Sequence, residues 1–389
     1  MKNTGINILE LIEGYVKGII EEMLLEERQI YLEEHPATKG NGFYTRNLKT
    51  ALGELNELRV PRSRDNGFRS GLLPERRGYS VDLEELIRAL IVAGVSSRKL
   101  GEIIQQLYGS RLSHTTITRI SEVAESEIQG WRHRSLQKQY AVIIFDALYF
   151  PLKRNTVEQE AIYIALGFRY DGTREILGYW IPGGSESASN WSEILEELKH
   201  RGVQQVEFFV TDGLKGLKEA ILQVFPKTNY QRCVLHMVRQ TLNKVRVKDR
   251  MGIAEDLKNI YRAKDQKQAG EAFDLFRINW SSIYPRLVTA WQEALPELMT
   301  FMKLPPQIRS YVYTTNALER FIKEIKRRLK TMEMLPSPQS AEKFLYLIIK
   351  DKNEKYLQRK LKNWEYYFEK YLVNKKEVKV HRKTQTQLT

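Results

Sequence analysis

The 389-residue sequence contains one cysteine, Cys233. A single cysteine excludes an internal disulfide framework and is typical of a reducing compartment. No stretch approaches the ~18 consecutive apolar residues that span a bilayer, so we expect no membrane partner. Glu10 and Glu13 interrupt the apolar stretch near the N-terminus, so we expect no secretory signal. These absences predict a cytoplasmic protein.

Several catalytic and cofactor motifs are also missing. There is no phosphate-binding loop, dinucleotide fingerprint, serine or cysteine hydrolase motif or internal repeat. Cys233 and His236 form a C-x-x-H pair, but no second Cys/His pair follows at a spacing that would complete a zinc site. We therefore expect a structural role for this pair, through packing or hydrogen bonding beside a sheet.

The sequence does have a large excess of positive charge. It contains 62 lysines and arginines against 48 aspartates and glutamates, so the formal net charge is +14. Hydrophobic residues make up 42% and aromatic residues 10%, which excludes a disordered chain and allows a sizeable core. A positive excess of this size favours a polyanionic partner, most often nucleic acid. The alternative is a basic protein whose charge only keeps it soluble.

The N-terminal third is predicted to be mostly helical. Apolar residues recur at helical spacing over residues 6–33. Glycines, Pro61 and an Asn66-Gly67 turn signal then favour a small β-hairpin. The connector that follows is basic, through Arg59, Arg62, Arg64, Arg69, Arg76 and Arg77. It is either a solvated linker or an arm that follows DNA.

Residues 80–130 are predicted to form three helices that begin at serines and are separated by glycines. Two short helices, a tight turn and a third helix that opens with small polar residues indicate a helix-turn-helix. The alternative is a plain three-helix bundle. In the helix-turn-helix interpretation, the residues expected to contact DNA are Arg98, Lys99, His114, Thr115, Thr116, Thr118 and Arg119.

From residue 141 the pattern changes to strands. Three apolar runs at 141–152, 161–170 and 174–182 are followed by a helix, a strand, a helix and a short strand, NYQRCVLH. This β-β-β-α-β-α-β order predicts a mixed five-stranded sheet with helices on its faces. Residues 235–313 then read as helical, TTNALERFIKEIKRRLK as a basic helix, and 338–372 as helical again.

Three carboxylates stand in unusual places. Asp146 interrupts an apolar strand, where a lone carboxylate is costly to bury. Asp212 ends the next apolar run, and the carboxyl ends of strands are where α/β sheets build sites. Glu319 opens the basic helix. Taken singly, Asp212 could be a turn residue like Asp171 and Glu319 an ordinary surface residue.

Together, two strands and a helix could bring these carboxylates to one pair of divalent ions. Phosphodiester hydrolysis and strand transfer use two such ions ~4 Å apart, and Mg²⁺ prefers carboxylate oxygens and water. The cations beside Glu319 would bind phosphates on the way into the site. They are Arg320, Lys323, Lys326 and Arg327.

At these residues the chain resembles the Mutator-type transposases of bacterial insertion sequences. The resemblance lies in FDALY around Asp146, VTDGLKG around Asp212, QRCVLHMVR around Cys233 and His236, and TTNALERF around Glu319, and it is collinear over about residues 40–365. It implies a DDE recombinase with an RNase H-like core, in which Asp146, Asp212 and Glu319 are the catalytic, metal-binding triad. It assigns no role to Cys233 and His236.

The resemblance also implies an N-terminal dimerisation and DNA-binding region and an all-α insertion in the core. The interval between Asp212 and Glu319 has room for such an insertion. Trp280 or Trp291 in it would either stack on an unpaired base or pack the insertion's own core. The expected segments are a contact region 1–78, a helix-turn-helix domain 79–135, catalytic core 136–239, insertion 240–312, core and C-terminal helices 313–372, and a disordered basic tail 373–389.

The activity expected from this resemblance is Mg²⁺-dependent transposition, with Mn²⁺ as a substitute ion. The protein would bind terminal inverted repeats in double-stranded DNA, cleave the element end, and join the 3′-OH to target DNA. It would act as a homodimer in the bacterial cytoplasm, associated with the nucleoid. Two alternatives remain: a transposase-derived repressor, and an RNase H-like nuclease that only hydrolyses. Excision of the element and copying through a circle are both compatible with these residues.

Overall fold

The computed structural model describes residues 8–51, 53–73, 78–92, 95, 97–108, 125–182, 188–330, 334–335 and 337–386. The chain divides into two compact units, Met1–Ala124 and Glu125–Thr389. This division falls inside the segment 79–135 that the sequence suggested as one domain. The reason is that α5 (Glu125–Arg132) packs against the second unit, where Arg132 forms an ion pair with Glu342 at 2.8 Å.

The first unit is built around a helix and a hairpin. α1 (Ile8–Glu34) packs against β2 (Gly53–Ser63), which pairs antiparallel with β1 (Gly40–Thr50). Leucines of all three elements form the core: Leu24, Leu48, Leu55 and Leu58. The predicted hairpin is therefore confirmed: its strands are joined between Thr50 and Gly53, and the chain turns again after β2, where the N–H of Asn66 donates to the Ser63 carbonyl.

Two of the three helices predicted over 80–130 are present in the first unit. They are α2 (Val81–Val92) and α3 (Ser97–Tyr108). The Ser80 hydroxyl accepts a hydrogen bond from the backbone N–H of Leu83 at 3.4 Å, which is the expected N-cap. Residues 109–124, which include the predicted DNA contacts His114, Thr115, Thr116, Thr118 and Arg119, lie outside the described residues. The helix-turn-helix therefore stays a prediction.

The second unit contains the five-stranded mixed sheet that the sequence predicts. Its strands are β3 (Gln139–Lys153), β4 (Val157–Phe168), β5 (Arg174–Trp180), β6 (Gln205–Thr211) and β7 (Asn229–Arg232), with α6 (Ala188–His200) and α7 (Leu217–Val224) between them. Their order in the sheet is β5-β4-β3-β6-β7. β3, β4 and β5 pair antiparallel, whereas β6 is parallel to β3 and β7 to β6.

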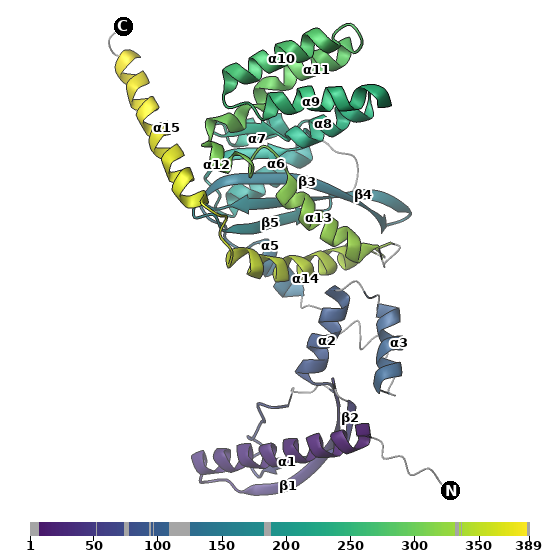
Figure 1. The fold of residues 1–389 in the computed structure, drawn as a ribbon. Coiled ribbons are helices and arrows are strands. Elements are labelled where there is room, and N and C mark those ends of the chain that lie inside the picture. Colours follow the sequence, from purple (N-terminus) through teal and green to yellow (C-terminus); the bar gives the residue numbers. More distant parts are fainter. Residues whose placement is uncertain are drawn as a thin grey trace. The chain divides into compact units, whose positions relative to one another are not determined.

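Helices cover both faces of this sheet (Figure 1). On one face, Ile143 and Phe145 of β3 share a buried cluster with residues of α6 and α7. The opposite face of β3 contacts α13 (Asn316–Leu329) and α14 (Pro338–Leu357). Because side chains alternate along a strand, Ile144 and Asp146 belong to the face that α13 covers.

The stretch between β7 and α13 is helical, as the sequence predicts. It comprises α8 (Val234–Asn243), α9 (Arg250–Tyr261), α10 (Gln266–Trp280), α11 (Pro285–Leu298), α12 (Pro306–Arg309) and two 3₁₀ turns, Val247–Asp249 and Thr300–Lys303. The predicted strand NYQRCVLH is only partly correct, because it ends at Arg232 and Cys233 is already the N-cap of α8.

Both tryptophans considered for base stacking pack within this helical stretch. Trp291 is fully buried and its indole N–H donates to Thr241 Oγ1 at 2.8 Å. Trp280 donates to Asp256 Oδ2 at 2.8 Å and lies against Tyr284. The core-packing alternative therefore fits these contacts.

The C-terminal helix differs from expectation. α15 (Trp364–Thr386) continues through most of the segment 373–389 that we expected to be a disordered tail. Its first half is anchored, because Trp364 and Phe368 are fully buried and stack on one another. An anchored first half nucleates the helix, and the lysines and glutamate that follow sustain it.

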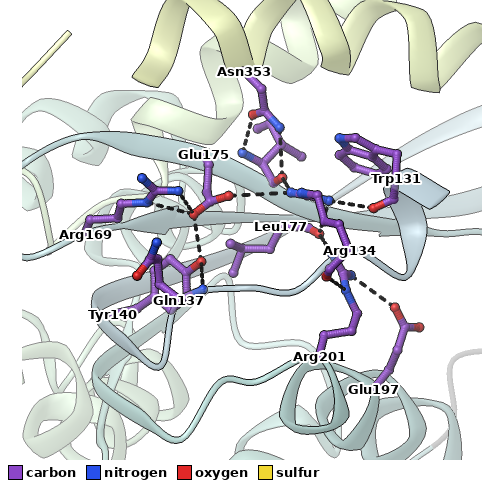
Figure 2. A network of polar contacts seen from close by, with 11 residues as sticks. Trp131, Arg134, Gln137, Tyr140, Arg169, Glu175, Leu177, Glu197, Arg201 and Asn353 are labelled. Atoms are coloured by element: carbon purple, nitrogen blue, oxygen red, sulfur yellow. Dashed lines mark hydrogen bonds and ion pairs between the residues drawn. The ribbon is translucent and has the colours of Figure 1, made fainter. Parts of the chain in front are cut away.

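A buried polar network closes the outer edge of β5 (Figure 2). Glu175, 5% exposed, accepts hydrogen bonds from Tyr140 at 2.7 Å and Arg169 at 2.9 Å, and lies 3.6 Å from Arg134. Arg134 also donates to the Ile176 carbonyl at 2.6 Å, and Asn353 of α14 bonds both backbone groups of Ile176. Side chains thus provide hydrogen-bond partners for backbone groups on the free edge of β5, where another strand would otherwise pair.

The described helices give no sign of a membrane span, since each one is too short or too polar to cross a bilayer.

Candidate active site

Two of the three predicted carboxylates lie close to each other along neighbouring parallel strands. Ile144 of β3 is the partner of Val210 of β6. Asp146 lies two residues further along β3, and Asp212 directly follows Thr211, the last residue of β6. Adjacent strands are ~5 Å apart. The pairing therefore brings Asp146 near the carboxyl end of β6, where Asp212 lies, and the charge of Asp212 acts on Asp146.

The turn after β6 requires a glycine. Gly213 has φ of 91°, and a Cβ there would lie 2.8 Å from Arg232 Nε. Its N–H donates to Thr211 Oγ1 at 3.2 Å, and Thr211 in turn bonds the Tyr230 hydroxyl at 2.8 Å. This turn places Asp212 directly after the strand, as the Asp-Gly pair in the sequence suggests.

Glu319 lies in the first turn of α13, which packs on β3. Glu319 is 8% exposed. A carboxylate in the first turn is favourable because it lies near the positive end of the helix dipole. Negative charge on Asp212 and Glu319 acts on Asp146. The structure therefore brings the three carboxylates into electrostatic contact.

The Glu319 carboxylate is held through one oxygen. Its Oε1 accepts from Arg239 Nη1 at 2.8 Å and from Thr315 Oγ1 at 3.4 Å, and it lies 3.5 Å from His236 Nε2. His236 Nδ1 is 3.3 Å from the same Thr315 hydroxyl. When both ring nitrogens are protonated, His236 Nδ1 donates a hydrogen bond to the Thr315 hydroxyl, and that hydroxyl donates a hydrogen bond to Glu319 Oε1.

Cys233 connects β6, which ends at Thr211, to α13, the helix of Glu319. Its backbone N–H donates to the Thr211 carbonyl at 2.7 Å, and the N–H of Val234 donates to the Tyr313 carbonyl at 2.9 Å. Its buried sulfur lies 3.5 Å from Thr315 Oγ1 and accepts from the Thr315 N–H at 3.4 Å. The expected structural role of this cysteine beside the sheet is consistent with these contacts.

Burial and charge shift the acid–base behaviour of these groups. Burial, followed by repulsion from Asp212, raises the pKa of Asp146 to about 7. Hydrogen bonding with Cys233 is the largest cause of a rise in the pKa of His236 to about 9, and Asp146 and Asp212 add to it. For Glu319, burial acts upwards, but the Arg239 hydrogen bond and charge prevail and lower its pKa.

The carboxylates of Asp146, Asp212 and Glu319 are the right ligand type for a hard divalent cation, but they are not arranged as a complete metal site. Carboxylate oxygens are the ligands that Mg²⁺ prefers, and repulsion at Asp146 is the unfavourable charge that a cation relieves. Within the described residues, however, no three His, Cys, Asp or Glu side chains are already arranged to hold a metal ion. Glu319 is instead engaged by Arg239 and His236.

The predicted cations of α13 form an exposed stripe that begins beside Glu319. It consists of Arg320, Lys323, Lys326 and Arg327. The next arginine, Arg328, is instead paired with Glu324 at 3.0 Å. In the first unit, Lys99 is exposed on α3, and Arg98 belongs to the same helix.

The sequence argument missed Arg239 and Thr315. Arg239 follows His236 by three residues on α8, so the two share a helix face, and this spacing was a signal for a joint contact. Thr315 precedes Glu319 by four residues and is the N-cap residue of α13. The contact of Thr315 with Glu319 is local, whereas that of Arg239 joins α8 to α13 and no local pattern reveals it.

Comparison with known proteins identifies the family of the chain. The family model described as "Transposase, Mutator family" matches residues 6–359. The chain is 37% identical over 361 residues to the transposase for insertion sequence element IS905 of Lactococcus lactis subsp. lactis, covering 91% of this chain and 92% of that protein. It is 32% identical to the transposase for IS1201 of Lactobacillus helveticus, covering 87% and 93%. It is 28% identical to the transposase for IS256 in transposon Tn4001 of Staphylococcus aureus, covering 90% and 91%. The chain therefore belongs to the Mutator family of transposases.

Proposed function

We propose that the protein is a DDE transposase that cleaves the ends of its element and joins them to target DNA. The observation that carries this proposal is the convergence of Asp146, Asp212 and Glu319 on one side of the sheet. The strand order β5-β4-β3-β6-β7, with an all-helical insertion before the helix of Glu319, supports an RNase H-like core. Membership of the Mutator family supports the reaction class.

In this proposal the three carboxylates bind Mg²⁺, with Mn²⁺ as a substitute. Bound ions would activate water, then the freed 3′-OH, and stabilise the leaving oxygen. Asp146 would contribute its carboxylate from β3, Asp212 from the turn directly after β6, and Glu319 from α13. The chain needs no nucleophilic side chain, because water and the DNA 3′-OH supply the attacking oxygens.

The exposed cations of α13 would position the DNA backbone. Arg320, Lys323 and Arg327 recur three to four residues apart, so they lie along one face of the helix. Such a row contacts phosphates without reading sequence. Recognition of the terminal inverted repeats is assigned to the first unit, through the predicted helix-turn-helix.

Pairing of two element ends requires two or more protomers, so we assign a homodimer. The exposed apolar side chains of α1 support it. Tyr15, Ile19, Met23 and Ile30 are 40–70% exposed although they belong to a long helix. Sedimentation of the full chain alone and with repeat DNA measures this assembly directly.

The decisive experiment is strand transfer in vitro. Repeat ends with a free 3′-OH are incubated with the full chain, Mg²⁺ and a plasmid target. The wild type should join the ends, and Asp146→Asn and Glu319→Gln should each abolish joining while still binding the repeat. Asp171→Asn is the matched control, because Asp171 also precedes a glycine but its carboxylate accepts hydrogen bonds from Thr173 within a turn.

Each alternative has its own outcome in this assay. A repressor would bind the repeats with neither cleavage nor joining under any divalent ion. An RNase H-like nuclease would cleave but never join. Full joining by Asp146→Asn or Glu319→Gln would refute the triad.

A further inference from the structure

We infer that His236 and Arg239 are positioning residues, which hold one oxygen of Glu319 so that the other oxygen is free to bind a metal ion. This inference rests on the proposed function, and it gives a role to the C-x-x-H pair that neither the sequence nor the family name assigns. It follows from the distribution of contacts over the two carboxylate oxygens of Glu319.

All the side-chain contacts of Glu319 fall on Oε1. Arg239 Nη1 donates to it at 2.8 Å, Thr315 Oγ1 at 3.4 Å, and His236 Nε2 lies at 3.5 Å. Within the described part of the chain, Oε2 has no such contact. A carboxylate fixed at one oxygen has lost its rotational freedom, and its second oxygen is presented in one direction.

The three residues that hold Oε1 come from two helices with a common anchor. His236 and Arg239 are one turn apart on α8, and Thr315 is the N-cap residue of α13. Cys233 joins the two helix starts through its sulfur and Thr315, and it joins both to β6 through the Thr211 carbonyl. These contacts fix the position of Glu319 relative to β6, the strand that ends beside Asp212.

This arrangement matches what second-layer partners do at metal sites. Groups that hydrogen-bond a ligating carboxylate orient it, and their loss costs ~10–100-fold in metal affinity or activity. Arg239 also compensates the negative charge of Glu319 while the ion is absent. Its side chain is half exposed, at 50%, so it also borders solvent, where DNA would approach.

The test measures metal binding without DNA and without catalysis. Mn²⁺ dissociation constants are determined on the full, metal-free chain by electron paramagnetic resonance. His236→Gln and Arg239→Gln should each weaken Mn²⁺ binding by about 10–100-fold, and Arg239→Lys should recover part of the loss. Lys267→Gln is the control, since the Lys267 side chain is 87% exposed on α10 and pairs with Glu271 of the same helix. Its Mn²⁺ affinity should equal that of the wild type.

A double-mutant cycle then identifies the route of the effect. In a Glu319→Gln background, Arg239→Gln should cause a smaller further loss than in the wild type, because the carboxylate that Arg239 orients has been removed. In strand transfer, Arg239→Gln should lower kcat and leave KM for repeat DNA unchanged. Melting temperatures verify that each variant is folded. If Arg239→Gln is not folded, Arg239→Lys is measured in its place.

Two results would overturn the inference. Unchanged or tighter Mn²⁺ binding by Arg239→Gln would mean that the arginine is neutral or competes with the ion. If Arg239→Gln bound Mn²⁺ normally but Asp146→Asn did not bind it, only the inference would fail and the proposed function would stand. If Asp146→Asn left Mn²⁺ binding intact, the proposed metal site would fail, and the inference with it.

Discussion

Asp146→Asn should make the protein more stable at pH 8 while removing its activity. Asp146 is 6% exposed, and burial with repulsion from Asp212 raises its pKa from 3.8 to about 7. A raised pKa in the folded state means that the stabilising proton is present at low pH and is lost as the pH rises through 7. Above that pH the folded protein retains a buried carboxylate that the unfolded chain solvates freely.

The size of the effect follows from the shift. Three pKa units at about 1.4 kcal/mol each give about 4 kcal/mol of destabilisation at pH 8. Because titration of the unfolded chain begins near 3.8, about 3 kcal/mol of this develops between pH 4.5 and pH 8. For a unit spanning Glu125–Thr389, that corresponds to a melting-temperature difference of roughly 6–12 °C. Asparagine carries no charge at either pH, so its variant avoids the penalty.

The assay is thermal unfolding at pH 4.5 and pH 8 in the presence of a chelator. The gain from Asp146→Asn should appear at pH 8 and be small at pH 4.5. Asp171→Asn is a control of opposite sign: partial burial acts upwards on Asp171, but hydrogen bonds from Thr173 prevail and lower its pKa. Its stabilisation is present above the ordinary pKa and lost in acid, so this variant should be less stable at pH 8. An Asp146→Asn effect that is equal at both pH values would refute the reasoning.

Three further outcomes are expected. Glu175→Gln removes the buried counter-ion of the half-buried Arg134 and Arg169 and should cost about 3–5 kcal/mol in urea unfolding; a second change, Arg134→Met, should restore part of it, and no loss would mean that the network of Figure 2 is not coupled. Arg320→Ala and Lys323→Ala should each reduce the salt slope of DNA binding by about one, with melting unchanged; an unaltered slope would remove the stripe from the DNA path. Trp291→Ala should cost about 3–5 kcal/mol because it empties a fully buried site, whereas repeat affinity per folded molecule should stay the same.

Much of the second unit was predictable because its signals are local. Apolar runs separated by turn residues predict β3 to β7 in the correct order, since strand formation follows the alternation and branching of neighbouring side chains. The carboxylates were visible for the same reason: Asp146 interrupts such a run, and Asp212 ends one. Where local signals were weak, prediction failed, as at Cys233, which caps a helix instead of continuing a strand.

The first unit was less predictable. The hairpin was expected, but several turn signals, among them Gly53 and Asn66-Gly67, left the position of its turn open, whereas pairing of Leu48 with Leu55 sets it at Thr50 to Gly53. Burial of those leucines against Leu24 of α1 decides the register, and this is a tertiary contact that turn propensity cannot report.

The sequence alone thus determined which residues are candidates for the site. They are the three carboxylates, the basic residues of the helix that follows the third, and a C-x-x-H pair without an assigned catalytic role. Only the tertiary structure decided how they meet. The register of β3 on β6 makes Asp146 and Asp212 neighbours, and the junction of α8 with α13 delivers Arg239 and His236 to one oxygen of Glu319. Residues 80 apart in the chain share no local pattern, because their contact depends on how helices pack and not on the residues beside them.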